Sequence, residues 1–98
     1  MKSLRSTKQN IKVLYVEDEN FVRDETVRVL KEIVEEVVVA EDGEEGLDKF
    51  KKHNIDLIIT DVNMPKLTGF EMLREIREIN QEVPAIILSA YGNSEFIP

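Results

Sequence analysis

Short apolar runs alternate with amphipathic segments along the chain. Four runs rich in valine, isoleucine and leucine lie at residues 12–16, 37–40, 55–60 and 85–89. Their hydrophobicity is continuous over successive residues, which is typical of strands buried on both faces of a parallel sheet. The pattern therefore predicts four parallel strands.

The segments between these runs have the spacing of helices. In the first segment, the stripe expected to face the sheet consists of Val22, Thr26, Val29 and Ile33, with Leu30 beside it. In the last segment, it consists of Met72, Leu73, Ile76 and Ile79. The middle segment, 44–52, has glutamates at its start and lysines at its end, which suits a helix dipole. These patterns predict three helices that cover the sheet.

Turn residues separate the predicted elements. Asp42 and Gly43 predict a turn after the second strand, while Pro65 and Gly69 bound a loop before the third helix. The order β-α-β-α-β-α-β predicts an α/β fold with a doubly wound parallel sheet and right-handed crossovers. We expect a flexible polar leader over residues 1–10 and one domain over residues 11–98.

The last residues predict an open sheet edge. Residues 93–96 have the signals of a helix start, with Asn93 or Ser94 as its cap, but the chain ends before a helix is completed. We therefore expect the fourth strand to be uncovered on its outer side. An exposed apolar edge invites pairing with another strand, so a homodimer through this edge is one expected partnership.

Composition excludes several classes of function. The net charge of −7 argues against a nucleic-acid surface, which would be basic. The chain has no cysteine, which excludes disulfides, thiolate metal sites and a cysteine nucleophile, and fits a reducing cytoplasm. No window approaches the ~20 apolar residues of a membrane span, and residues 1–10 do not resemble a signal peptide. We expect a cytoplasmic protein with no direct contact to nucleic acid or membrane.

Three acids follow two of the predicted strands. Glu17 and Asp18 come directly after the first run, and Asp61 comes directly after the third. Ligands of open parallel sheets bind outside the carboxyl ends of the strands, so these acids are expected at the edge where chemistry takes place. Oxygen ligands suit Mg²⁺, with Mn²⁺ as an alternative, whereas one histidine and no cysteine disfavour zinc.

A metal at this edge would make Asp61 a feasible nucleophile toward phosphorus, because it would screen the repulsion between the carboxylate and a phosphoryl group. Ser89 ends the fourth run, where its hydroxyl could bond a phosphoryl oxygen or serve as an ordinary strand-end serine. Asn63 could face a metal or water, or be an ordinary turn residue. No glycine-rich phosphate loop and no serine nucleophile elbow occur in the sequence.

With these residues assembled, the chain resembles the receiver domain of bacterial two-component response regulators, over about residues 11–96. The resemblance lies in three motifs: VLYVEDE at 13–19, DVNMP at 61–65 followed by Gly69, and PAIILSA at 84–90. Any one of these motifs is common, but three in this order on alternating strands and helices are specific. The resemblance implies a flavodoxin-like sheet of strand order 2-1-3-4.

The resemblance also implies a role for each site residue. Asp61 would be the phosphoacceptor, and Asp18 the principal metal ligand with Glu17 assisting through water. The backbone of Asn63 would complete the metal site, and Ser89 would hydrogen-bond the phosphoryl group. In this family, residues placed like Asn63 and Tyr91 tune the lifetime of the acyl phosphate, and a small residue such as Ala90 leaves space beside it.

The implied function is a phosphorylation switch that assists its own phosphorylation and dephosphorylation, and is not an enzyme acting on other substrates. A sensor histidine kinase, a phosphotransfer protein or a small phosphodonor would supply the phosphoryl group, with Mg²⁺ bound. The added charge of about −2 would then bias a loop rearrangement.

The chain departs from the family at its end. Receivers carry a further helix, strand and helix, including a lysine at the end of strand five, and neither that lysine nor the strand's aromatic residue can be placed here. We therefore expect a receiver incomplete at its C-terminus. One alternative is a fragment that only binds partners or dimerises. Another is a Mg²⁺-dependent phosphohydrolase with an aspartyl nucleophile, although Asn63 stands where such enzymes carry a second acid.

Overall fold

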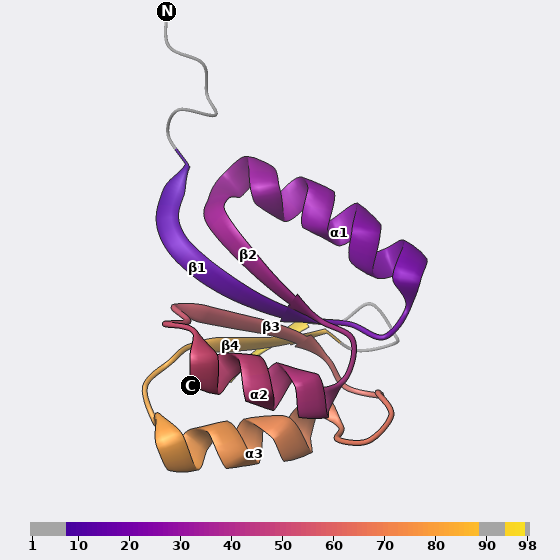
Figure 1. Ribbon diagram of the computed structural model, residues 1–98, viewed down its shortest axis with the longest axis vertical. Coiled ribbons are helices and arrows are strands. Elements are labelled where there is room, and N and C mark those ends of the chain that lie inside the picture. The colour runs from indigo at the N-terminus through magenta and orange to yellow at the C-terminus, as the bar shows by residue number, and fades with distance from the viewer. Residues whose placement is uncertain (1–7, 89–93, 98) are drawn as a thin grey trace, which may run out of the picture.

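The computed structural model describes residues 8–88 in full and the backbone of residues 94–97. Strands and helices alternate along the chain until the fourth strand (Figure 1). The elements are β1 (Gln9–Val16), α1 (Asn20–Ile33), β2 (Val34–Ala40), α2 (Gly43–Lys52), β3 (Leu57–Asp61), α3 (Gly69–Ile79), β4 (Ala85–Leu88) and β5 (Ser94–Ile97). None of the helices in the described ranges is long and apolar enough to cross a membrane.

The strands form one sheet in the order β2-β1-β3-β4-β5. The first four are parallel, which confirms the predicted α/β fold with strand order 2-1-3-4. The register aligns Val16 of β1 with Thr60 of β3, and Asp61 of β3 with Leu88 of β4. The carboxyl ends of these strands therefore meet at one edge of the sheet.

The predicted helix start at residues 93–96 is wrong. Ser94–Ile97 forms β5, which runs antiparallel to β4 and pairs Ser94 with Leu88 and Ile97 with Ala85. A single helical turn is costly to nucleate, whereas pairing satisfies the backbone groups along the outer side of β4. The outer side of β4 is therefore covered, and the expected homodimer through an open strand-four edge loses its structural basis.

The first two strands begin earlier than their apolar runs. β1 starts at Gln9, inside the segment expected to be a leader, and β2 starts at Val34, directly after the last residue of α1. The polar residues Gln9 and Asn10 belong to β1 because this end of the strand pairs with β2, with a shift in register between Gln9 and Lys12. Ladder pairing, which is not local in sequence, thus extends the strands beyond their hydrophobic centres.

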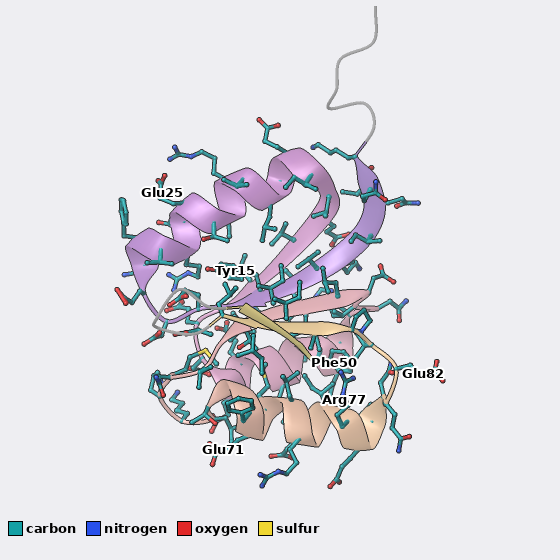
Figure 2. All side chains as sticks on the ribbon, turned by 180° about the vertical axis from the view of Figure 1, so that it is seen from behind. Tyr15, Glu25, Phe50, Glu71, Arg77 and Glu82 are labelled. Carbon is teal, nitrogen blue, oxygen red and sulfur yellow. The ribbon has the colours of Figure 1, made fainter. Side chains whose placement is uncertain are left out.

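Helices cover both faces of the sheet. α2 and α3 lie side by side on one face, while α1 lies on the other, over β1 and β2 (Figure 1). The larger part of the core lies under α2 and α3 and includes Phe50, Met72 and Ile76. The smaller part lies on the α1 side and includes Tyr15, which sits between α1 and the sheet (Figure 2).

The predicted sheet-facing stripe of α1 is largely wrong. Val22, Val29 and Ile33 are 39%, 58% and 50% exposed, and no residue of α1 is fully buried. Leu30, which was predicted beside this stripe, packs on the sheet as expected, and Val27, which was not predicted, packs there too. Neighbouring stripes of this helix are similarly apolar, and only the sheet decides which of them is covered. For α3 the predicted stripe is confirmed at Met72, Leu73 and Ile76, while Ile79 at the helix end is exposed.

Candidate functional site

The three acids predicted at the sheet edge lie together. Glu17 and Asp18 directly follow β1, and Asp61 is the last residue of β3, the neighbouring parallel strand. One carboxylate oxygen from each residue lies within 4.8 Å of the other two. Glu17 is buried, at 6% exposure, Asp61 is half-buried and Asp18 is exposed. The cluster thus reaches from the protein interior to solvent.

Backbone N–H groups hold two of the three carboxylates. Glu17 Oε2 accepts a hydrogen bond from the N–H of Glu19 at 3.1 Å, and Asp61 Oδ1 accepts one from the N–H of Val62 at 2.8 Å. No described lysine or arginine lies within ion-pair distance of these acids. One oxygen of each of these two carboxylates is therefore oriented by the backbone.

The electrostatics of the cluster favour a cation. Burial raises the pKa of Glu17, and the nearby charges of Asp61 and Asp18 raise it further against the opposing effect of the Glu19 N–H. Burial also raises the pKa of Asp61, with Asp18 and Glu19 adding to the rise and the Val62 N–H opposing it. Three converging carboxylates that form no ion pair with a described lysine or arginine are a donor set that suits a hard divalent ion such as Mg²⁺ or Mn²⁺.

The backbone of Asp61 is clamped from two sides. The Thr60 hydroxyl donates to the Asp61 carbonyl oxygen at 2.9 Å, and Thr60 is completely buried. On the other side, the Gly69 N–H donates to the Val62 carbonyl at 2.8 Å. A Cβ atom at Gly69 would lie 2.2 Å from the Asp61 carbonyl oxygen, so this position has room only for glycine.

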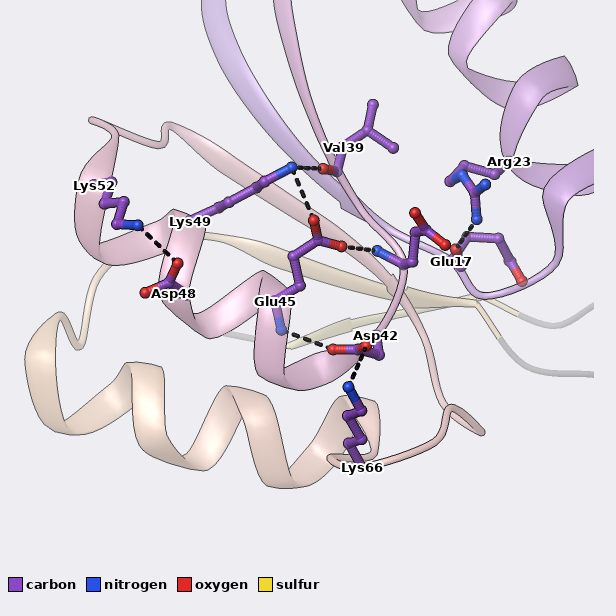
Figure 3. A network of polar contacts seen from close by, with 10 residues as sticks. Glu17, Arg23, Val39, Asp42, Glu45, Asp48, Lys49, Lys52 and Lys66 are labelled. Atoms are coloured by element: carbon purple, nitrogen blue, oxygen red, sulfur yellow. Dashed lines mark hydrogen bonds and ion pairs between the residues drawn. The ribbon is translucent and has the colours of Figure 1, made fainter.

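The loop that follows Asp61 packs against the start of α2. Lys66 has a positive φ of 71° and its Nζ lies 3.8 Å from Asp42, the residue that caps α2 (Figure 3). A Cβ atom at Gly43 would lie 2.2 Å from the Leu67 carbonyl oxygen. Asn63 is exposed in this loop, one residue before the buried Met64. The side chain of Asn63 is therefore accessible near the cluster.

The strand that leads to the predicted phosphoryl-side residues is described, but those residues are not. β4 ends at Leu88, which pairs with Asp61 in the ladder. Ser89, Ala90 and Tyr91, which follow it, lie outside the described residues.

Sequence reasoning did not identify the positioning role of three residues: Thr60, Gly69 and Arg23. Gly69 was identified as a loop boundary and as part of the family motif, but its contact with Asp61 is a tertiary distance that spacing does not encode. Arg23 donates from Nη1 to the Glu17 carbonyl at 2.9 Å (Figure 3). An arginine in the first turn of an amphipathic helix gives no signal that separates it from solvent-facing charges.

Comparison with known proteins identifies the family. The family model of the response regulator receiver domain matches residues 13–97. The chain belongs to the response regulator receiver domain family. Response regulator RR06 of Streptococcus pneumoniae is 38% identical to it over 81 residues, which is 83% of this chain and 37% of that protein. The chain thus spans little more than a third of the length of this relative.

Two further relatives support the assignment. Chemotaxis protein CheY of Bacillus subtilis is 33% identical over 87 residues, which is 88% of this chain and 72% of CheY. The crystal structure of response regulator protein TrrA from Thermotoga maritima, in complex with Mg(2+)-BeF, superimposes with a TM-score of 0.76 at 40% identity. The match covers 83% of this chain and 70% of TrrA. This receiver domain is therefore a module of two-component signal transduction with a flavodoxin-like fold.

Proposed function

We propose that this receiver domain accepts a phosphoryl group on Asp61 from the phosphohistidine of a sensor histidine kinase or phosphotransfer protein. The observation that carries the proposal is the convergence of three carboxylate oxygens within 4.8 Å at the carboxyl edge of the sheet. In the transfer, a bond forms between a carboxylate oxygen of Asp61 and phosphorus while the phosphorus–nitrogen bond of the donor breaks. The histidine nitrogen keeps the electron pair of the broken bond, and with its ring protonated the histidine leaves as the neutral imidazole, while the domain becomes a phosphoprotein.

Mg²⁺ is the cofactor in this proposal, and Mn²⁺ can replace it. Asp18, Glu17 and Asp61 would hold the ion, together with the backbone carbonyl of Asn63. When bound, the ion supplies positive charge against the repulsion between Asp61 and the incoming phosphoryl oxygens. The oxygen-only donor set and the raised pKa values of Glu17 and Asp61 support this assignment. The Mg(2+)-BeF complex of the relative TrrA agrees with this assignment.

The chain's own residues orient the acceptor. The Val62 N–H bonds Asp61 Oδ1 and so fixes the direction in which the carboxylate faces the site. The clamp formed by Thr60 and Gly69 fixes the backbone from which the side chain projects. Ser89 would donate its hydroxyl to a phosphoryl oxygen, and Asn63 and Tyr91 would set the lifetime of the acyl phosphate. The receiver family is consistent with an acceptor role for this chain, without turnover of other substrates.

A second candidate function is a receiver that binds partners without reacting. The observation in its favour is β5, which takes the sheet position beside β4 as an antiparallel strand. The resemblance instead implies a parallel strand that follows a helix and ends in a lysine. The four residues of β5 include no lysine to pair with a phosphoryl group.

Incubation with Mg²⁺ and acetyl phosphate, followed by weighing of the intact protein, separates the two candidates. The phosphoacceptor predicts one added phosphoryl group in the wild type and in D48N, a control at an exposed acid of α2 that pairs with Lys52. It predicts no addition in D61N. A folded wild type that gains no mass would support the binding-only function.

A further inference from the structure

The turn between β1 and α1 holds two of the three acids and is unlike the other helix starts. α2 begins with a side-chain cap from Asp42, and α3 begins with a capping box formed by Thr68 and Glu71. Glu19, at the cap position of α1, makes no such side-chain hydrogen bond. The turn that carries Glu17 and Asp18 therefore needs another means of support.

Arg23 supplies that support. It lies in the first turn and a half of α1 and directs its side chain back toward the helix start, as helical side chains do. Nη1 donates to the Glu17 carbonyl at 2.9 Å, and Nη2 donates to the Asn20 side-chain oxygen. Figure 3 shows the guanidinium reaching from α1 to Glu17. The planar fork of arginine suits two acceptors at once, which the single ammonium of lysine does not.

The carbonyl that Arg23 holds belongs to the peptide between Glu17 and Asp18. Because a peptide unit is planar, fixing this oxygen also fixes the direction in which Asp18 leaves the turn. The Glu19 N–H holds the side chain of Glu17 at the same time. The guanidinium bonds a carbonyl and an amide and leaves all three carboxylates free for a metal.

We propose that Arg23 is a positioning residue that presents Glu17 and Asp18 to a divalent cation. This inference rests on the proposed function, since it takes the three acids as the metal site. The direction in which cation affinity changes on loss of Arg23 tests this inference. Loss of a positive charge beside three acids should by itself tighten cation binding, so a weakening on loss of Arg23 would come from positioning.

Direct titration with Mn²⁺, followed by electron paramagnetic resonance, tests the inference without any phosphodonor. R23M should raise the Kd for Mn²⁺ by about 10-fold, the size typical of residues that orient metal ligands. R23K keeps the charge without the fork and should recover only part of the affinity. R28M is the matched control, because Arg28 is an exposed arginine of the same helix that pairs with Glu25 at 3.1 Å, and it should bind as the wild type does.

N20A tests the same network without removing the arginine, and should weaken Mn²⁺ binding less than R23M does. This variant keeps the test decisive if R23M does not fold. R23M binding as tightly as the wild type, or more tightly, would overturn the positioning role while leaving the phosphoacceptor proposal intact. A folded wild type that binds no Mn²⁺ would overturn both.

Discussion

At the scale of single residues, the position of Asp61 depends on Gly69, because glycine has no side chain. Gly69 approaches the Asp61 carbonyl so closely that a Cβ atom would lie 2.2 Å from that oxygen. The neighbour is backbone and cannot rotate away, so any larger residue must displace the acceptor strand end or the start of α3. Gly69 therefore couples the reactivity of the site to the packing of a helix.

We predict that G69A lowers the free energy of unfolding by about 2 kcal/mol, in the range of overpacked sites, and slows labelling by acetyl phosphate. G46A is the matched control. A Cβ there would meet side chains and not backbone, lying 2.6 Å from the sulfur of Met72 and 3.0 Å from a methyl group of Val16, and these can repack, so G46A should cost less than G69A. Urea unfolding and the labelling rate measure both effects. Equal stability of G69A and wild type would contradict the clamp.

The buried acid Glu17 should make stability depend on pH. Its pKa is raised in the folded state, chiefly by burial, so the folded chain holds this proton at pH values where the unfolded chain has lost it. The contribution of Glu17 to stability is therefore greatest below the usual pKa of a glutamate and is lost as the pH rises through the folded pKa.

E17Q removes the cost of burying an ionised carboxylate and keeps an acceptor for the Glu19 N–H. We predict that E17Q unfolds at higher denaturant than the wild type at neutral pH without metal, and that the difference disappears below the usual glutamate pKa. E75Q, a change at an exposed glutamate of α3, should show no such dependence. A wild type that is the more stable of the two at neutral pH would refute the account of this cluster.

At the scale of elements, α2 is tied to the edge strand β2 by one lysine. Lys49 Nζ donates to the Val39 carbonyl at 2.6 Å and pairs with Glu45 at 3.2 Å (Figure 3). Glu45 in turn accepts from the Glu41 N–H at 2.7 Å, a bond that lowers the pKa of Glu45. This network joins α2 to the sheet. The start of the same helix supports the loop after Asp61.

We predict that K49M lowers the free energy of unfolding by about 1 kcal/mol, the value of one partly buried hydrogen bond. K52M is its control, since Lys52 makes a similar pair with Asp48 at 3.0 Å on the same helix but both residues are exposed. Thermal and urea unfolding should give K52M the same stability as the wild type. Equal losses in the two variants would mean that the Val39 carbonyl bond does not anchor the helix.

The four parallel strands could be predicted because burial on both faces leaves continuous apolar runs such as 55–60, and the acids could be predicted because Asp61 follows one run directly. The covered face of α1 could not be predicted in full, because Val29 and Leu30 are similarly apolar and only packing decides which of them is buried. β5 could not either, because local helix signals at Asn93 and Ser94 compete with a strand pairing that the local sequence does not encode. The support that Arg23 gives to the Glu17 carbonyl likewise exists only in three dimensions.

At the scale of the whole molecule, the parallel sheet brings two strand ends together and so creates one site from residues far apart in sequence. A ligand that binds this site only in the folded state must stabilise the entire domain. The proposed metal site therefore predicts a global effect of Mg²⁺ on unfolding.

We predict that Mg²⁺ at about 100 times its Kd raises the free energy of unfolding by about 2.7 kcal/mol, and that D18N abolishes this gain. D24N is the control, because Asp24 is an exposed acid at the start of α1 and its loss changes the net charge equally. Denaturant unfolding with and without Mg²⁺ gives the result. If D18N and D24N respond to Mg²⁺ alike, the ion acts on the overall charge and not at the cluster.

The most direct test of the central claim is to locate the phosphoryl group. After reaction with Mg²⁺ and acetyl phosphate, borohydride reduction converts an aspartyl phosphate to homoserine, which peptide mass spectrometry can assign to a residue. The proposed function predicts homoserine at position 61 alone, and none in D61N. A reduced product at Asp18 or Glu17, or labelling that persists in D61N, would contradict the assignment of Asp61 as the phosphoacceptor.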